Sequence, residues 1–211
     1  MTPNGLQVNH ISGMQLPPEA LERGVPAEPI KMAGLLGEIC KEKKILTHRV
    51  AVVLPPEVGF QRLVDLPTQL TTDEARLYIQ DSTNNVQIPF PLNQTDFDLT
   101  PVLSPVIAQQ HEGKRPYMLS AIPQQLVDRV IEMLKLADLE LQLLELGSLS
   151  QLRTLASDLT HLPQNKVDLV LELLPDSSNL LMVTSSGLLA WERISSIRDF
   201  PEPNLDEDQV T

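Results

Sequence analysis

A phenylalanine flanked by two prolines is the strongest local constraint in this sequence. Pro89 and Pro91 lie on either side of Phe90, in an apolar segment that also contains Ile88 and Leu92. Proline lacks a backbone N–H, and it disfavours helical geometry in the residue before it. We therefore expect this segment to be extended or turned, outside any helix or central strand. An apolar side chain in such a stiff loop either fills a crevice in the core or contacts a partner, and the pattern leaves both readings open.

The charge of the chain argues against nucleic acid as a partner. The 211 residues include 16 Lys and Arg against 28 Asp and Glu, which gives a formal net charge of −12. Aromatic residues make up only 3%. A nucleic-acid binder needs cations for the phosphates, and it needs aromatic rings if it stacks single-stranded bases. An acidic chain is also repelled by anionic membrane surfaces.

The sequence predicts a soluble, cytoplasmic protein. Cys40 is the single cysteine, so no internal disulfide can form, as is typical of a reducing compartment. The first residues lack the basic and apolar regions of a signal peptide. No apolar run approaches the roughly 20 residues that a membrane-spanning helix needs.

The N-terminal part predicts one helix and one strand after an irregular start. Residues 1–28 are rich in proline, with at most one edge strand near residues 6–8. Pro29 suits the first turn of a helix with an apolar face, on which Cys40 reads as a small buried hydrophobe. Residues 49–54 form a near-continuous β-branched run, typical of a strand buried on both faces.

The middle of the chain predicts a ferredoxin-like module. From residue 60 to residue 146 the pattern gives strand, helix, strand, strand, helix, strand, the βαββαβ order. Thr71 and Glu74 form a capping box at the first helix. The two middle strands are expected at residues 96–106 and 117–122, joined by a polar hairpin loop.

The C-terminal part predicts a small meander and a tail. Ser148 is placed to cap a short helix, and residues 167–173 and 180–191 are expected to form two or three strands. The acidic residues after position 198 are typical of a disordered tail, and a metal site there is disfavoured.

Several of these segments, taken in order, resemble the type IV pilus assembly protein PilM family, which is related to the division protein FtsA. The matching stretches are residues 49–55, residues 88–92 with Asp96 and Phe97, residues 117–122, and Leu143, Glu145 and Ser148 ahead of a helix. The resemblance implies an α/β (α+β) fold: a partial actin-like (RNase H-like) core interrupted by the ferredoxin-like βαββαβ subdomain.

The resemblance also suggests a division of the chain. The actin-like core would comprise residues 5–57 and 147–197, the inserted subdomain residues 58–146, and the tail residues 198–211. In PilM the cytoplasmic N-terminal tail of the inner-membrane protein PilN is bound in a groove between core and insert. The resemblance therefore implies a PilN-like partner, and Ile88, Phe90 and Leu92 are our candidate contact residues.

The phosphate-binding motifs of the family are missing here. The chain begins after the first glycine-rich hairpin, and the second hairpin falls on Glu172, Leu174, Pro175 and Asp176. Glycine lets backbone N–H groups curl around phosphate oxygens. Leu174 replaces that glycine, Pro175 removes one N–H, and Asp176 adds a repelling charge. We therefore expect no nucleotide cofactor.

Other candidate sites are weak. The four histidines are scattered singly, so we expect no zinc site. Gly113-Lys114 lacks the upstream glycine of a P-loop, and the residues around Ser148 lack the second glycine of a nucleophile elbow.

We therefore expect a non-enzymatic adaptor of pilus assembly, which approaches the membrane only through its PilN-like partner. The alternative is a fragment of a nucleotide-binding, actin-like ATPase of pilus assembly or cell division. A third reading, a small-ligand or enzymatic α/β domain of unknown chemistry, has no positive support. Host pilus class and oligomeric state stay open.

Overall fold

The helices begin where the sequence provides a start signal. In the computed structural model, which describes residues 11–84, 86–103, 113–173 and 177–195, Pro29 begins the first helix as predicted. The predicted capping box is confirmed: Glu74 N–H donates to Thr71 Oγ1 at 3.3 Å, and Thr71 N–H donates to Glu74 Oε2 at 2.8 Å. The four helices described are α1 (Pro29–Glu42), α2 (Thr72–Gln80), α4 (Gln124–Leu136) and α5 (Gly147–Leu159).

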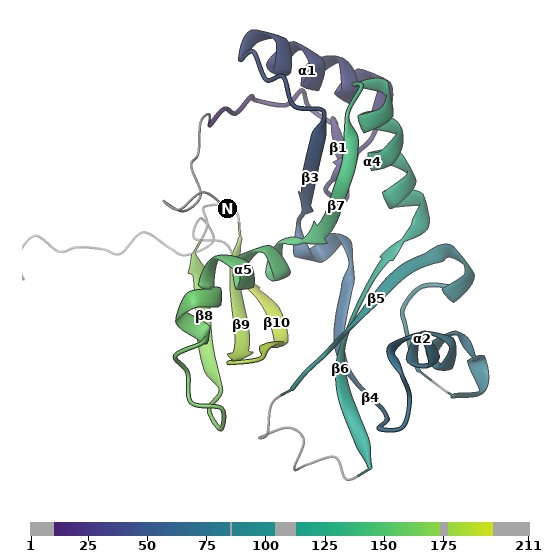
Figure 1. Cartoon of the computed structure of the whole chain (residues 1–211). Helices are drawn as coiled ribbons and strands as arrows, with labels where there is room; N and C mark the ends of the chain where they lie inside the picture. The colour runs from purple at the N-terminus through teal and green to yellow at the C-terminus, as the bar shows by residue number, and fades with distance from the viewer. Residues whose placement is uncertain (1–10, 85, 104–112, 174–176, 196–211) are drawn as a thin grey trace, which may run out of the picture. The chain divides into compact units, whose positions relative to one another are not determined.

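Ten strands are described, before, between and after these helices (Figure 1). They are β1 (Leu21–Glu22), β2 (Val25–Pro26), β3 (Arg49–Leu54), β4 (Phe60–Pro67), β5 (Thr95–Pro101), β6 (Lys114–Pro123), β7 (Glu140–Leu146), β8 (Asp168–Leu173), β9 (Ser178–Thr184) and β10 (Gly187–Ser195). Short 3₁₀ turns occur at η1 (Pro56–Val58), η2 (Ser82–Asn84) and η3 (Leu92–Gln94). The α/β class predicted from the sequence is confirmed.

A small hairpin near the N-terminus departs from the prediction. Residues 1–28 were expected to contain at most one edge strand, near residues 6–8, and those residues lie outside the described part. Instead β1 pairs antiparallel with β2, from Leu21 opposite Pro26 to Glu22 opposite Val25. The connecting residues Arg23 and Gly24 both have positive φ, 51° and 78°. Two such residues are what a type I′ hairpin turn requires.

Contacts divide the described chain into two units. Unit 1 contains residues 11–59, 90–96 and 122–147, and unit 2 contains residues 60–84, 86–89, 97–103, 113–121, 148–173 and 177–195. The sequence-based assignment of segments to an actin-like core and an inserted subdomain uses different boundaries, and it stays a prediction.

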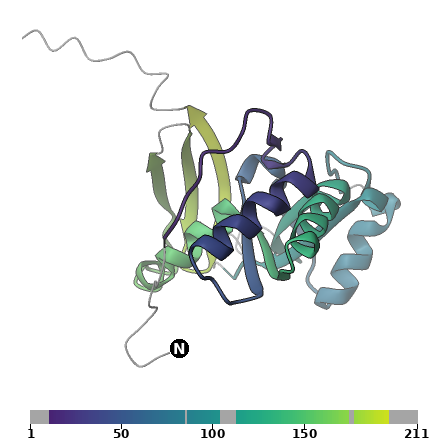
Figure 2. The same cartoon turned by 90° about the horizontal axis from the view of Figure 1, so that it is seen from above.

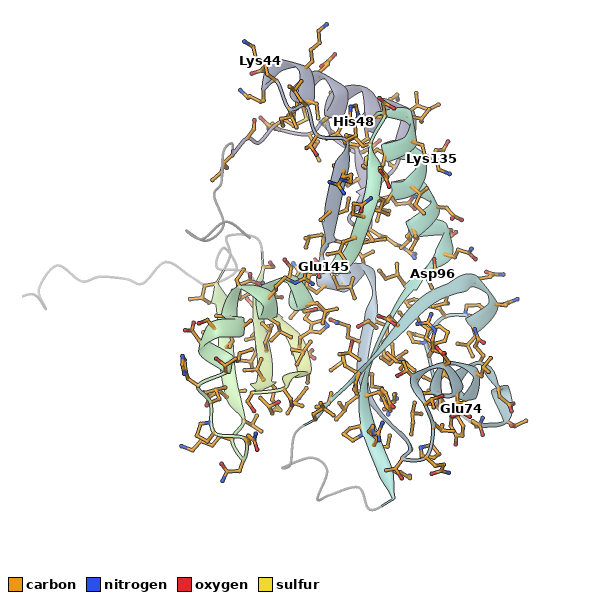
Figure 3. All side chains as sticks on the ribbon, in the orientation of Figure 1. Lys44, His48, Glu74, Asp96, Lys135 and Glu145 are labelled. Carbon is orange, nitrogen blue, oxygen red and sulfur yellow. The ribbon has the colours of Figure 1, made fainter. Side chains whose placement is uncertain are left out.

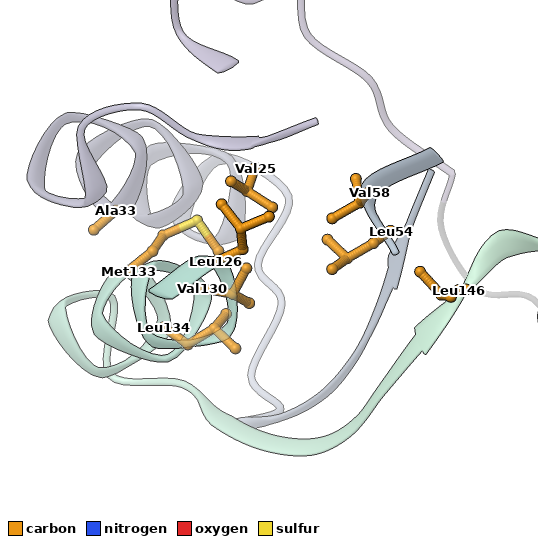
Figure 4. Packing of buried hydrophobic residues seen from close by; sticks show 9 residues of the cluster. All are labelled: Val25, Ala33, Leu54, Val58, Leu126, Val130, Met133, Leu134 and Leu146. Carbon is orange, nitrogen blue, oxygen red and sulfur yellow. The ribbon is translucent and has the colours of Figure 1, made fainter. Parts of the chain in front are cut away.

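Unit 1 is built on a parallel strand pair. β3 pairs with β7 from Arg49 opposite Glu140 to Leu54 opposite Leu146. Helices α1 and α4 pack against each other, as Figure 2 shows from above. The core joins side chains from β2, α1, β3, η1, α4 and β7 (Figure 4), namely Val25, Ala33, Leu54, Val58, Leu126, Val130, Met133, Leu134 and Leu146.

The expectation that residues 49–54 are buried on both faces is wrong. In β3 exposed residues alternate with half-buried ones, and only Leu54 is fully buried. Val50 and Val52 pack against the core, whereas Val53 is 49% exposed. The helices of unit 1 cover the face that carries Val50 and Val52, and no described element of this unit buries the opposite face.

Unit 2 contains two three-stranded sheets. In the first sheet the order is β4-β6-β5, and β4 runs antiparallel to β6 from Phe60 opposite Ala121 to Pro67 opposite Lys114. In the second sheet β8, β9 and β10 form an antiparallel meander, as the sequence predicts. Side chains from the meander, α5 and β6 share one core that includes Met118, Leu159, Leu181, Val183 and Leu188.

The element order of the predicted ferredoxin-like module is present, but its last strand pairs elsewhere. β4, α2, β5, β6, α4 and β7 follow one another as expected. β7, however, pairs with β3 in a separate sheet, so three strands and not four share the β4-β6-β5 sheet. In the parallel pair with β3, the apolar residues of β7 pack into the core of unit 1 that the helices cover. Most of the polar loop before β6 lies outside the described residues.

Two further sequence expectations concern the C-terminal part. The helix expected to start after Ser148 starts two residues earlier, at Gly147. The Ser148 hydroxyl is buried and donates to the Gln61 side-chain oxygen, so its described role is to join α5 to β4. The predicted acidic tail at residues 198–211 lies outside the described residues.

Candidate functional site

The segment around Phe90 is irregular, as its prolines predict. Residues 86–91 form neither helix nor strand, and η3 begins at Leu92. Ile88, Phe90 and Leu92 are each half-buried. The turn after Phe90 is held by Thr95, whose hydroxyl donates to the Pro91 carbonyl at 2.8 Å. By contacts, Phe90 and Leu92 belong to unit 1 and Ile88 to unit 2.

Phe90 lines two neighbouring cavities of unit 1, which we call the Phe90 pockets. The first has a volume of about 380 Å³, and its apolar wall includes Pro55, Val58 and Leu126. The second has a volume of about 340 Å³, and polar residues from the start of α4 line it. Arg23, Phe90 and Pro123 contribute to both. The site therefore combines an apolar floor with a polar rim, the usual character of a ligand pocket.

Gly24 allows the β1–β2 hairpin to form one wall of the first pocket. A Cβ atom built on Gly24 would lie 2.8 Å from Cγ2 of Val58 and 3.0 Å from Cγ of Pro55. Its φ of +78° is also costly for any residue that has a side chain. This position therefore requires glycine for two independent reasons.

An ion pair joins the same hairpin to α4. Arg129 Nη1 donates to Glu22 Oε2 at 2.5 Å. The hydrogen bond and the positive charge of Arg129 lower the pKa of Glu22, and the charge of Arg23 adds a smaller lowering. Next to this pair, Val25 is completely buried in the core of unit 1. Both contacts fix the hairpin that presents Arg23 to the pockets.

The chemistry of the Phe90 pockets suits binding better than catalysis. The rim carries the exposed guanidinium of Arg23 and the side chains of Gln124, Gln125 and Asp128. Amide and guanidinium groups can hold the backbone of an extended peptide, while Phe90, Val58 and Leu126 can contact an apolar side chain. No histidine, cysteine or serine lines either pocket among the described residues.

A larger cavity of about 580 Å³ lies between residues 17–22 and α1. Its lining includes Leu21, Met32 and Leu35, and it contains none of the residues that the sequence singled out. Two of its charged lining residues, Glu28 and Lys31, form an ion pair at 2.6 Å.

The degenerate phosphate loop is only partly described. Glu172 lies in β8, and its Oε2 accepts a hydrogen bond from Asn179 Nδ2 at 2.6 Å. Leu174, Pro175 and Asp176 lie outside the described residues, so their effect on nucleotide binding stays a prediction.

The other chemically notable residues form no cluster. His48 stands at the start of β3 (Figure 3), with its Nδ1 3.0 Å from the Asp138 carbonyl oxygen. Cys40 is a free, half-buried thiol in α1. No group of three or more potential metal ligands occurs within the described segments. Among the helices described, none is long and apolar enough to cross a membrane.

Sequence reasoning found Phe90 but missed the residues that surround it. Arg23, Pro55 and Pro123 come from three segments that are far apart in the chain. The Arg23-Gly24 pair at a positive-φ turn was the one local sign of the hairpin, since strands of two residues produce no periodicity.

Several solved structures resemble this chain, and two of them are described here. One is described as a PilM-PilN type IV pilus biogenesis complex, with a TM-score of 0.73 and 25% identity over 88% of this chain. The other is the cytoplasmic domain of EpsL, an inner-membrane component of the type II secretion system of Vibrio cholerae, with a TM-score of 0.50 and 13% identity over 77% of this chain. The match covers 54% of the first structure's chain and 56% of the second, so this chain spans about half their length.

The likeness to EpsL concerns the fold alone. A search among curated proteins gave no match. The family model for type IV pilus assembly protein PilM matches residues 2–187. Because this match covers most of the chain and agrees with the structural likeness, the chain belongs to the type IV pilus assembly protein PilM family and shares its actin-like fold.

Proposed function

We propose that this protein is a non-enzymatic scaffold of type IV pilus assembly, which binds the cytoplasmic N-terminal tail of a PilN-like inner-membrane protein. Membership of the PilM family and the likeness to a chain solved in a PilM-PilN complex support this proposal. The observation that carries it is the position of Phe90, which lines both pockets of unit 1.

In this proposal an apolar side chain of the tail packs against Phe90. The prolines beside Phe90 hold the loop stiff before binding, which reduces the conformational entropy lost when a partner docks. The amide side chains of Gln124 and Gln125 are available for the polar backbone of an extended peptide. Ile88 and Leu92 flank Phe90 in sequence and remain candidate contacts.

The proposal places the protein in the cytoplasm, where it reaches the inner membrane through its partner. It includes no catalytic residue and no cofactor. The substitutions Leu174, Pro175 and Asp176 in the phosphate loop support the absence of nucleotide binding. Titration of the chain with ATP and magnesium should give no saturable heat, and micromolar binding would favour the ATPase alternative.

Phe90→Ala tests the partner site directly. Truncation of a pocket-lining aromatic anchor should weaken binding of a synthetic PilN-like tail peptide by about 1–3 kcal/mol, or roughly 5- to 150-fold in Kd. Calorimetric titration gives the affinity, and a thermal melt of the same variant gives its stability. Leu136→Ala is the matched control, because Leu136 is an apolar residue of the same unit that is 54% exposed and lines neither pocket.

The two readings of Phe90 predict different results. Loss of affinity with a nearly unchanged melting temperature supports a partner contact. A large fall in melting temperature, with peptide affinity retained by the folded fraction, would assign Phe90 to the core and contradict the proposed site.

A further inference from the structure

The cavity of about 580 Å³ beside α1, which we call the α1 groove, has an apolar lining that is open to a long side chain. All of its lining residues lie between positions 17 and 35, within one described segment of unit 1. Leu21 is 46% exposed, and Met32 and Leu35 are each half-buried. These three side chains can contact the methylene groups of a bound residue.

Backbone hydrogen bonds hold the wall of the groove that faces α1. The Ala20 N–H donates to the Pro17 carbonyl at 3.1 Å, which closes a turn that also contains Pro18. The Ala27 N–H donates to the Ala20 carbonyl at 2.9 Å, which joins this turn to the strand after the hairpin. The groove is therefore formed before any ligand binds, so a ligand loses less entropy when it docks there.

The rim of the α1 groove is acidic. It carries three carboxylates and one ammonium group, those of Glu19, Glu22, Glu28 and Lys31. Glu22 pairs with Arg129 and Glu28 pairs with Lys31. Glu19 is exposed and has no ion pair among the described residues. Its carboxylate is therefore available to a cation from outside the chain.

An apolar lining below a free carboxylate matches the side chains of lysine and arginine. Both combine an aliphatic stem, which packs on apolar surface, with a charged head that stays at the rim. An anionic side chain would meet three carboxylates there, and a wholly apolar one would leave Glu19 without a partner. The groove therefore fits a peptide segment that carries Lys or Arg.

The α1 groove is continuous with the Phe90 pockets. Glu22 lines the groove, and the next residue in the hairpin, Arg23, lines both pockets. Consecutive Cα atoms are about 3.8 Å apart. One extended peptide can thus contact both sites by crossing the β1–β2 hairpin.

The proposed partner has the required chemistry. Cytoplasmic segments that adjoin a membrane span carry an excess of Lys and Arg. The formal charge of −12 on this chain attracts such a segment before contact. We infer, on the basis of the proposed function, that the α1 groove binds the basic segment of the partner's tail, while the Phe90 pockets hold an apolar residue of the same tail.

The two contacts differ in strength and in their response to salt. A pair between Glu19 and an exposed cation contributes roughly 2- to 5-fold in affinity, because water and salt screen it. It should also accelerate association. The apolar contact at Phe90 does not depend on ionic strength in this way.

Two synthetic peptides separate the contacts. One reproduces the PilN-like tail up to its membrane span, and the other has Gln in place of each Lys and Arg. Calorimetric titration of the full chain should show tighter binding of the basic peptide. Its advantage should shrink as ionic strength rises from about 0.05 to 0.5 M. Phe90→Ala should weaken both peptides by a similar factor.

A charge reversal locates the basic segment. Glu19→Lys should weaken binding of the basic peptide by roughly 3- to 20-fold and leave the neutral peptide unchanged. A third peptide, with Glu in place of each Lys and Arg, should bind Glu19→Lys more tightly than the unmodified chain. Glu38→Lys is the matched control, because Glu38 is an exposed carboxylate of α1 that lines none of these cavities. Circular dichroism confirms that both variants are folded.

Contrary results for the groove and for the proposed function can be told apart. If basic and neutral peptides bind equally and Phe90→Ala weakens both, the groove inference is wrong and the Phe90 site stands. If Glu19→Lys and Glu38→Lys weaken the basic peptide equally, the attraction comes from the overall charge and not from the groove. If neither peptide binds, the proposed function and the groove inference are both wrong.

Discussion

Similar apolar strands are buried to different extents in the two units. In unit 1 Leu54 of β3 is buried in a core that also contains side chains from β2, α1, η1, α4 and β7. In unit 2 the leucines Leu169, Leu171 and Leu173 of β8 stay more than half exposed, although the other face of their sheet packs in a core. The comparison shows that residue type does not decide burial. The neighbouring elements decide it.

The largest expected effect is a difference in the free energy of unfolding between variants of a buried and an exposed leucine in the β8–β9 ladder. Leu181 is completely buried, so Leu181→Ala should lower the free energy of unfolding by about 2–5 kcal/mol through lost contacts and a cavity. Leu171→Ala should change it by less than about 0.5 kcal/mol, since this side chain is largely in water. Urea unfolding at low protein concentration measures both. Equal losses would show that the face of β8 is covered after all.

A second comparison uses one glycine from each unit. Gly24 and Gly113 have nearly the same φ, +78° and +73°, so alanine should cost roughly 1–2 kcal/mol of strain at either position. Only at Gly24 does a Cβ meet other atoms, at 2.8 Å from Val58, which adds about 1–3 kcal/mol for overpacking. Unfolding curves should therefore show that Gly24→Ala loses about 1–3 kcal/mol more free energy of unfolding than Gly113→Ala. If they coincide, the hairpin moves aside easily and does not form a fixed wall of the pocket.

The smallest expected effect concerns acid pH and the hairpin of unit 1. Arg129 lowers the pKa of Glu22 below its ordinary value of 4.5. A lowered carboxyl pKa stabilises the fold above the unfolded-state pKa, and this contribution disappears as pH falls through the folded-state pKa. Glu22→Gln should therefore lower stability slightly near neutrality, where the pair with Arg129 is ionised, and leave it unchanged at pH values below the folded-state pKa, so that stability depends less on pH in the acid range.

NMR titration of the Glu22 side chain and urea unfolding across the acid range measure this effect. Glu38→Gln is the control, because Glu38 is an exposed carboxylate of α1 with no described ion pair. An unchanged acid profile in Glu22→Gln would mean that the pair with Arg129 is not maintained in solution.

Local signals in the sequence predicted most helices correctly. Pro29 begins α1 and Thr71 and Glu74 cap α2, as the sequence predicts. The apolar residues Leu126, Val130 and Leu134, spaced at helical intervals in the sequence, form the buried face of α4. These features depend on residues within one or two turns of each other, which a single sequence displays directly.

Pairing between distant segments could not be predicted in the same way. The β-branched residues 49–54 predicted the strand β3. No nearby residue indicates that β7 is its partner, or which face of β3 the helices cover. The candidate site has the same limitation. Phe90 is marked by its own prolines, whereas Arg23 and Pro123 become neighbours only through folding.

The parallel pair of β3 and β7 has a consequence for biosynthesis. All of β4, α2, β5, β6 and α4 lies between these strands in sequence, so β3 leaves the ribosome long before its partner exists. At ordinary translation speeds the delay is roughly 5–20 s. During that time β3 has neither its partner strand nor the helix α4 that contributes to its core, while the antiparallel pair of β4 and β6 can already form. A nascent chain of this protein therefore exposes Val50 and Val52 as a natural binding site for chaperones until residue 146 emerges.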